Sequence, residues 1–201
     1  MRASKLSRET IRRLPWKNGR GETQEIAIHP PGSSLAAADF DWRLSRAAVV
    51  EDGPFSRFPG FDRSLVLIAG GGIDLRHGGE APDRYLPPLE PHAFSGDWTT
   101  EGRLRAGPVE DLGLIWRRGL LRGRIEVVSD FDASLSTGGE ILLLHLVRGH
   151  CVVVDGMTPG GIALEAFETY RVEAPPSGLM LGFQDAADGT LAIAVRIEAL
   201  G

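Results

Sequence analysis

Residues 65–70 read Leu-Val-Leu-Ile-Ala-Gly, and residues 144–149 read Leu-His-Leu-Val-Arg-Gly. Each apolar run ends on a glycine and is followed by a second short run, Ile73–Leu75 in the first case and Val152–Val154 in the second. We expect each pair of runs to form a β-hairpin that turns at the glycine, because glycine accepts the positive φ that tight turns require. The two copies lie 79 residues apart, which predicts two similar β halves in one chain.

The rest of the chain continues this pattern. Apolar residues recur with period two along most segments, as where Trp42 and Leu44 alternate with Arg43 and Ser45. Such alternation is typical of β-strands, whose successive side chains point to opposite faces. The 26 glycines and 13 prolines agree with many short segments joined by turns. The sequence therefore predicts an all-β fold.

Composition excludes several functional classes. The net charge is -5, and the first twenty residues hold seven of the 22 basic residues but one of the 27 acidic ones, so the remainder is strongly acidic. An acidic surface argues against nucleic acid as a partner. No apolar run approaches the roughly 18 residues that cross a bilayer, so we expect no membrane partner. The single cysteine and the lack of an apolar leader point to the cytoplasm.

Aromatic residues, arginines and turn residues crowd together in residues 15–63. The segment Asp52–Arg63 reads Asp-Gly-Pro-Phe-Ser-Arg-Phe-Pro-Gly-Phe-Asp-Arg. In one interpretation the Gly-Pro and Pro-Gly pairs set tight bends, and three phenylalanines plug the end of a barrel. In the other, the region forms the mouth of a pocket, where apolar walls carry a few polar groups. The sequence leaves both interpretations open.

These segments resemble the HutD/Ves family. The family carries a Trp-Lys-Asn-Gly-Gly-Gly-like start, a Trp-Arg-x-Ser segment and a block like Asp52–Arg63, followed by a Phe-x-Gly-Asp turn like Phe94–Asp97. The stretch Gly107–Gly113 is similar to its Gly-Pro-x-x-Asp-x-Asn segment. The resemblance covers roughly residues 5–120 in ordered motifs. Two departures stand out, because Arg20 replaces a family glycine and Gly113 replaces the usual asparagine, and either could change the ligand preference.

The resemblance implies a bicupin, with two double-stranded β-helix (jelly-roll-like) barrels in one chain. We expect the N-terminal cupin barrel in residues 1–115, with the family motifs and the pocket, and the C-terminal cupin barrel in residues 116–201. The family is associated with bacterial histidine utilisation, where it is thought to bind a small pathway carboxylate and limit induction. It has no settled enzymatic activity.

A metal centre and a nucleophile both lack support. The five histidines include no His-x-His pair, which metal cupins usually carry, and Arg63 stands about where such a cupin has its glutamate. We therefore expect no metal and no other cofactor. His150 and Cys151 are adjacent on a strand and point to opposite faces, so they cannot act together. Cys151 is better interpreted as a buried, inert thiol.

A site that binds an anion would give a role to residues that otherwise lack one. Arg43 and Ser45 share a strand parity, and Arg63 could add a bidentate guanidinium–carboxylate contact. We predict a ligand site formed by Asn18, Arg43, Ser45, Arg63, His92 and Phe94, with no catalytic residue. The alternative is that each arginine only pairs structurally with a nearby carboxylate, such as Asp41, Asp52, Asp62 or Asp97. Asp62 and Asp97, both in glycine-rich turns, are better interpreted as turn-capping acceptors than as ligands.

We therefore expect a cytoplasmic carboxylate-binding protein without catalysis, which regulates histidine utilisation or acts as a sink for an intermediate. The ligand would be formylglutamate or urocanate, by resemblance to the family alone. One alternative is a metal-independent cupin enzyme, an isomerase or hydrolase of a small acid with His92 as acid–base. Another is a stress-response interaction module of the Ves type. A homodimer is the ordinary expectation for such barrels.

Overall fold

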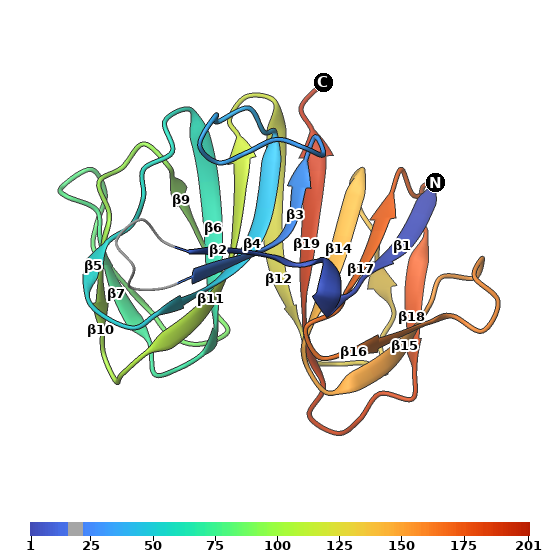
Figure 1. The fold of residues 1–201 in the computed structure, drawn as a ribbon. Helices are drawn as coiled ribbons and strands as arrows, with labels where there is room; N and C mark the ends of the chain where they lie inside the picture. The colour runs from blue at the N-terminus through green and yellow to red at the C-terminus, as the bar shows by residue number, and fades with distance from the viewer. Residues whose placement is uncertain (16–21) are drawn as a thin grey trace. The chain divides into compact units, whose positions relative to one another are not determined.

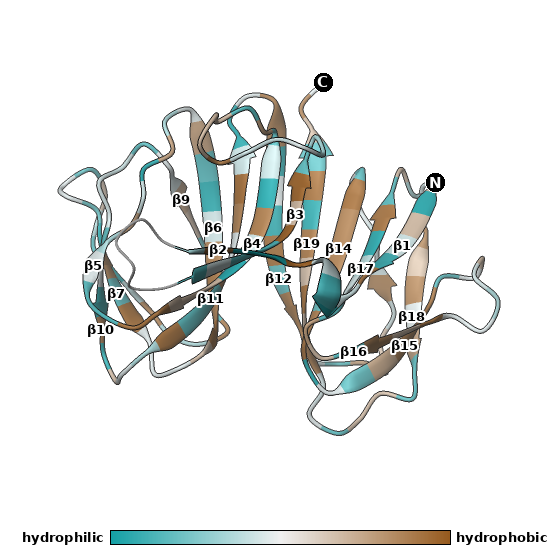
Figure 2. Cartoon of the chain, viewed as in Figure 1, coloured by the Kyte–Doolittle hydropathy of each residue, from teal (hydrophilic) through white to brown (hydrophobic). Residues whose placement is uncertain are grey.

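A computed structural model describes residues 1–15 and 22–201 of the chain (Figure 1). Strands make up almost all of its regular structure, and the only helix in the described ranges is the three-residue 3-10 turn η1 (Arg8–Thr10). The all-β class expected from the period-two pattern is thereby confirmed. In Figure 2 hydrophobic and hydrophilic bands follow each other along many of the strands.

The chain divides into two compact units. The N-terminal unit comprises residues 11–123, and the C-terminal unit comprises residues 1–10 together with residues 124–201. Each unit contains a larger sheet and a four-stranded sheet, and each is described here by itself.

In the N-terminal unit the larger sheet has six strands in the order β2-β3-β4-β11-β6-β9, and the second sheet has the order β5-β10-β7-β8. The strands are β2 (Arg12–Pro15), β3 (Glu22–His29), β4 (Trp42–Val49), β5 (Gly53–Pro54), β6 (Phe61–Ala69), β7 (Ile73–Arg76), β8 (Arg84–Leu86), β9 (His92–Ser95), β10 (Glu101–Leu104) and β11 (Val109–Arg117).

In the C-terminal unit the larger sheet has five strands in the order β1-β17-β14-β19-β12, and the second sheet has the order β13-β18-β15-β16. The strands are β1 (Arg2–Leu6), β12 (Leu121–Val128), β13 (Leu135–Ser136), β14 (Ile141–Arg148), β15 (His150–Val154), β16 (Ile162–Glu165), β17 (Thr169–Glu173), β18 (Met180–Gln184) and β19 (Leu191–Ala199).

The two units repeat one topology. Strands β4 to β11 occupy the same places in their sheets as strands β12 to β19, taken in the same order. In each unit an apolar core joins the two sheets: Leu65 and Leu67 of β6 cluster with Ile73 and Leu75 of β7. The equivalent strands β14 and β15 share the core of the other unit. The repeat read at an offset of 79 residues therefore reflects two units of equivalent strand order.

The expected hairpins are absent, and the sequence prediction was wrong on this point. β6 pairs with β11 and β9, and β14 pairs with β19 and β17. Both edges of β6 and of β14 are thus already hydrogen-bonded, so β7 and β15 are placed in the opposite sheet. Gly70 (φ +96) and Gly149 (φ +81) turn the chain from one sheet to the other, and their positive φ explains why both are glycine.

The N-terminal strand lies in the C-terminal unit. β1 pairs antiparallel with β17 from Arg2 to Leu6, as Figure 1 shows. The Lys5 ammonium group also contacts the buried Glu168 carboxylate at 3.1 Å. The units seen in the structure therefore differ from the division at residue 115 expected from the sequence, since residues 1–10 belong to the C-terminal unit and β12 begins at the junction.

Candidate functional site

The polar residues singled out in the sequence share one face of the six-stranded sheet. Ile115 on β11 lies opposite Arg43 on one side and Arg63 on the other, and Arg63 in turn lies opposite Phe94. Residues directly opposite each other in a sheet point to the same face, as do residues two apart on one strand. Ser45, two residues from Arg43, and His92, two residues from Phe94, therefore join the same face.

This face also carries core residues of the N-terminal unit, because Leu65 and Leu67 lie two and four residues beyond Arg63 on β6. The predicted side chains are therefore directed between the two sheets of the unit. Five of the six predicted ligand-binding residues are brought together in this way. The sixth, Asn18, lies outside the described residues.

Arg43 is held in place by a buried carboxylate. The residue is 3% exposed, and its Nε donates to Glu25 Oε2 at 2.8 Å. Its Nη1 donates to Ser45 Oγ at 3.2 Å, so the guanidinium group and the hydroxyl group form one network. The sequence suggested aspartates as structural partners of the arginines and did not suggest Glu25. It was missed because β3 bulges between Glu25 and Ala27, which shifts the alternation of that strand.

Arg63 is surrounded by aromatic rings. Its guanidinium carbon lies 5.2 Å, 5.6 Å and 5.0 Å from the ring centroids of Phe55, Phe58 and Phe94, distances at which a cation interacts with the ring faces. Its Nη1 donates to the carbonyl oxygen of Ser56 at 3.2 Å. Burial lowers the pKa of Arg63 to about 10, which leaves the group positively charged at neutral pH.

Asp111 is a second buried carboxyl group on this face. It lies on β11 opposite Ala47 and Leu67 and is 7% exposed. A Cβ atom built on Gly113 would lie 3.5 Å from Asp111 Oδ1, so the carboxyl group leans over the glycine. Burial raises the pKa of Asp111 to about 7, against the charge of Arg63, which lowers it. The sequence reasoning quoted Asp111 within a family segment but assigned it no role.

Two histidines lie beyond Phe94. His77, which the sequence reasoning did not select, is 1% exposed, and its Nδ1 shares a 3.1 Å hydrogen bond with Thr100 Oγ1. The centroids of His77 and His92 are 5.9 Å apart, and those of His77 and Trp98 are 5.1 Å apart. Desolvation by burial lowers the pKa of both histidines below the ordinary value near 6.5, which keeps their rings neutral at pH 7.

These histidines line a pocket of about 280 Å³ in the N-terminal unit. Its walls are formed by His77, Ala81, Pro82, Asp83, Arg84, His92, Ala93 and Trp98. Pockets that bind small molecules are usually concave, largely apolar and supplied with a few polar groups. The aromatic and imidazole rings of this pocket fit that description.

Four buried nitrogen atoms of the N-terminal unit receive no hydrogen-bonding partner from residues 1–15 or 22–201. They are Arg43 Nη2, Arg63 Nε, His77 Nε2 and His92 Nε2. Buried polar atoms normally have partners, and exceptions are often functional. An arginine nitrogen can only donate, and a neutral imidazole nitrogen donates in one of its two tautomers. The interior of this unit is therefore suited to a molecule that offers hydrogen-bond acceptors.

The neighbouring aspartates have structural roles. Asp97 accepts a hydrogen bond from the Gly60 backbone N–H at 2.8 Å and from Ser95 Oγ at 3.1 Å, which confirms its interpretation as a turn acceptor. The Arg118 guanidinium group contacts Asp62 and Asp97 together. The structure thus pairs these carboxylates with Arg118 and leaves Arg43 and Arg63 to other partners.

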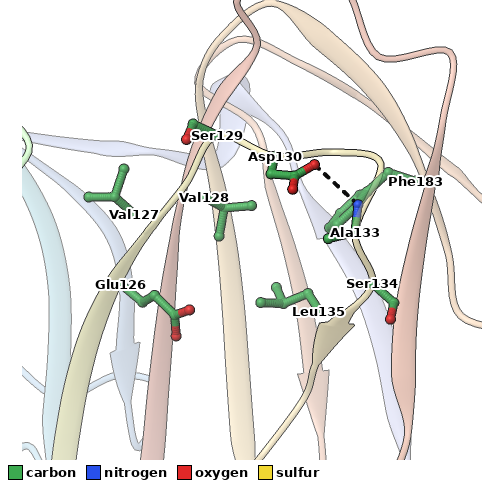
Figure 3. Close-up of a pocket in the computed structure, with 9 residues that line it drawn as sticks. All are labelled: Glu126, Val127, Val128, Ser129, Asp130, Ala133, Ser134, Leu135 and Phe183. Atoms are coloured by element: carbon green, nitrogen blue, oxygen red, sulfur yellow. Dashed lines mark hydrogen bonds between the residues drawn. The ribbon is translucent and has the colours of Figure 1, made fainter.

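A pocket of about 210 Å³ occurs in the C-terminal unit (Figure 3). Its apolar wall is formed by Val128, Leu135 and Phe183. Its carboxylates are already bound, since Glu126 pairs with Arg196 and Asp130 accepts hydrogen bonds from its own loop, one of them from the Ala133 backbone N–H. These contacts stabilise the loop and leave the pocket without a distinctive chemistry.

The buried histidine and cysteine of the C-terminal unit also have structural roles. His145 lies on the face of β14 opposite to Leu144 and Leu146, and its Nδ1 shares a 2.9 Å hydrogen bond with Thr169 Oγ1. Cys151 is 2% exposed, and burial raises its pKa to about 11, so the sulfur is a thiol at neutral pH. Such a thiol is a poor nucleophile.

No group of three or more histidine, cysteine, aspartate or glutamate side chains in residues 1–15 and 22–201 could hold a metal ion. No helix in the same ranges has the length and apolarity needed to cross a membrane.

Comparison with known sequences gives related proteins over most of the chain. The model of the HutD family matches residues 8–192. Protein Ves of Escherichia fergusonii is 34% identical over 142 residues, which cover 67% of this chain and 70% of that protein. Protein Ves of Citrobacter koseri is 35% identical over 139 residues, with the same coverage of both chains.

Comparison with solved structures gives similar folds over the full length. A conserved protein of unknown function from Pseudomonas aeruginosa PAO1 is 30% identical, with a TM-score of 0.84 over 100% of both chains. HutD from Pseudomonas fluorescens SBW25, solved in a formate condition, is 30% identical, with a TM-score of 0.81 over 100% of both chains.

More distant structures share the fold alone. The Escherichia coli pirin YhhW in complex with nickel(II) is 6% identical, with a TM-score of 0.62 over 99% of both chains. Oxalate decarboxylase OxdC from Bacillus subtilis, as a mutant, is 7% identical, with a TM-score of 0.64 over 96% of this chain and 76% of that one. These similarities show a cupin-like β fold.

Proposed function

This chain belongs to the HutD family, and from that premise we propose that it binds a small carboxylate in the N-terminal unit without chemical conversion. Its role would be regulatory, as a sensor or sink for an acidic intermediate of histidine utilisation in the cytoplasm, with formylglutamate or urocanate as ligand. The observation that carries the proposal is the set of buried, unpartnered nitrogens on Arg43, Arg63, His77 and His92 among the described residues.

The architecture proposed with this function is a bicupin. The equivalent order of strands β4–β11 and β12–β19 supports two double-stranded β-helix barrels, and the cupin-like structural neighbours agree with it. The polar face of the first barrel carries the proposed site. The C-terminal unit has an apolar core at the corresponding strands, with Leu144, Leu146 and Ala194 directed between its sheets.

The two arginines differ in what they can offer a carboxylate. Arg43 already pairs with Glu25, so it presents its remaining nitrogen from a neutral ion pair. Arg63 lies among phenylalanine rings and forms no carboxylate contact within 4 Å in the described part of the chain, so its positive charge is available to an anion. Charge-assisted hydrogen bonds from guanidinium to carboxylate are among the stronger ones in proteins. Arg63 is therefore the principal anion-binding residue of the proposal.

Isothermal titration calorimetry with a panel of four acids tests this function. The panel consists of formate, glutarate, formylglutamate and urocanate, with the methyl ester of urocanate as an uncharged control. We expect at least one acid to bind and the ester to bind far more weakly, because the ester cannot form the ionic contact. Absence of binding by every acid of the panel would refute the proposal.

The variant Arg63→Met removes the charge and keeps an apolar side chain of similar length among the phenylalanines. We expect affinity to fall about 100-fold, since a buried hydrogen bond between charged groups contributes about 1.5–3 kcal/mol. The matched control is Arg103→Met, at an exposed position on β10. Equal affinities of the two variants, with folding verified by circular dichroism, would show that Arg63 is no part of the site.

A second outcome would favour an enzyme. His92 carries one of the unpartnered nitrogens, and burial lowers its pKa, which favours the neutral ring that a general base requires. Conversion of a bound acid, detected by NMR and lost in His92→Ala, would replace the binding function by catalysis.

A further inference from the structure

The polar face of the N-terminal unit buries as many acidic as basic side chains. Among the described residues, Glu25 and Asp111 supply two carboxyl groups, and Arg43 and Arg63 supply two guanidinium groups. Glu25 contacts Arg43 at 2.8 Å and also pairs with Arg12 at 3.4 Å. Asp111 has no such close ion pair in the described ranges, and it interacts with Arg63 through their charges at longer range.

A carboxylate that enters this face adds a third negative charge to two positive ones. An uncompensated charge in a dry interior costs several kcal/mol, and titratable groups in that position usually become neutral instead. Glu25 already contacts two arginines, Arg43 and Arg12. Asp111 is the remaining buried carboxyl group, and its partner Arg63 is the group that the ligand would engage.

We infer that a carboxylate is bound to this site together with one proton, and that Asp111 is the residue that takes the proton up. The inference rests on the proposed function and specifies how the same site accepts an anion. The proton comes from the solvent and forms the O–H bond of the Asp111 carboxyl group, and no other bond is made or broken. The neutral carboxyl group can then donate a hydrogen bond to the ligand carboxylate, while Arg63 provides the positive charge.

The geometry permits this role. Asp111 leans over Gly113, which lies between Ser45 and Leu65 in the sheet register, so no side chain at position 113 separates the carboxyl group from the arginines. Gly113 therefore leaves the carboxyl group free to face a ligand held by Arg63.

Several other titratable groups lie around Asp111 on its own strand and on the elements packed against it. On the neighbouring strands, Glu25 and Arg43 form the buried ion pair, and Arg63 has a pKa of about 10. His77 and His92 have lowered pKa values and are neutral between pH 7 and pH 9. On β11 itself, Glu110 pairs with Arg46 at 2.9 Å and, as a like charge, further raises the pKa of Asp111.

The pH dependence of affinity follows from these charges. With a pKa of about 7 in the free protein, Asp111 is already neutral at pH 6 and is largely ionised at pH 9. Binding coupled to the uptake of one proton weakens tenfold for each pH unit above 7. We therefore expect the acid of the panel with the lowest Kd to bind about 50-fold more weakly at pH 9 than at pH 7. Affinity is therefore retained at low pH and is lost as the pH rises and Asp111 ionises.

The experiment measures this Kd and the number of protons taken up, by calorimetry in buffers of different ionisation enthalpy. We expect close to one proton per ligand at pH 8.5 and close to none at pH 6. Asp111→Asn, a neutral isostere, should hold its affinity within about threefold from pH 7 to pH 9 and exceed the wild type at pH 9. Asp132→Asn, an exposed change of the same charge in the C-terminal unit, should retain the wild-type profile.

Binding without proton uptake at pH 8.5, or an unchanged pH profile in Asp111→Asn, would overturn the inference while the proposed function stands. Absence of binding by all four acids from pH 6 to pH 9 would overturn both. If Asp111→Asn does not fold, the proton count measured on the wild-type protein decides the question alone.

Discussion

At the scale of the residue, the buried charges of the N-terminal unit are the unusual feature. Glu25 and Arg43 are each about 4% exposed at their side chains, and Ser45 extends their contact into a small network. A buried ion pair contributes little net stability when both partners are present, because desolvation offsets the attraction. Loss of one partner is costly, since the other charge stays in the interior without compensation.

The substitution Glu25→Gln tests this contact. It preserves the size of the side chain and leaves Arg43 as an uncompensated buried cation, so we expect the free energy of unfolding to fall by about 3 kcal/mol. Urea denaturation followed by circular dichroism measures the change. Glu22→Gln on the same strand is the control, because its pair with Arg13 is exposed and should contribute less than about 1 kcal/mol. Equal losses in the two variants would contradict the role of burial.

At the scale of the element, the glycine turns explain how one chain makes two facing sheets. Gly70 follows β6, whose edges are both paired, and directs the chain into the opposite sheet. The backbone there is crowded as well as left-handed, because a Cβ atom on Gly70 would lie 2.5 Å from the Pro108 carbonyl oxygen. Gly60 also has a positive φ, but nothing lies within 4 Å of its Cβ position.

Comparison of Gly70→Ala with Gly60→Ala separates the cost of the left-handed backbone from the cost of crowding. Both variants force alanine into a left-handed conformation, which costs about 1–2 kcal/mol. Gly70→Ala must also displace the backbone near Pro108, which we expect to add at least about 2 kcal/mol. Urea unfolding of both variants gives the difference. A Gly70→Ala variant as stable as Gly60→Ala would show that the crossover tolerates a side chain.

At the scale of the whole molecule, the chain does not divide at a single point in the sequence. Residues 1–10 belong to the C-terminal unit, because β1 completes the edge of the sheet beside β17. Edge strands expose unpaired backbone groups, so a strand that covers such an edge protects it from exchange with water. The ion pair between Lys5 and the buried Glu168 adds a side-chain contact at the same edge.

Removal of residues 1–7 tests this arrangement. We expect the amides in residues 169–173 that β1 covers to exchange faster, because their partners are lost, while those of β6 in residues 61–69 keep their protection. Hydrogen exchange followed by mass spectrometry measures both segments in one experiment. Unchanged exchange in residues 169–173 would mean that β1 is dispensable for the C-terminal unit.

Much of this molecule is determined by its sequence alone. Period-two alternation requires strands, and the repeated apolar run ending on glycine indicates two equivalent halves, because both signals depend on local backbone geometry. The parity of Arg43 and Ser45 likewise placed them on one face, and the crowding of phenylalanines around Arg63 was visible as a dense segment. These features arise between residues close together in the chain.

The tertiary structure alone decided which strands pair and which charges meet. Hairpins were expected at Gly70 and Gly149, but the neighbours of β6 and β14 are strands distant in sequence, and their pairing places β7 and β15 in the other sheet. Glu25 reaches Arg43, and Asp111 reaches the surroundings of Arg63, only because β3, β4, β11 and β6 lie side by side. Burial then raises the pKa of Asp111 towards neutrality, and burial is a property of the assembled sheets that no local pattern contains.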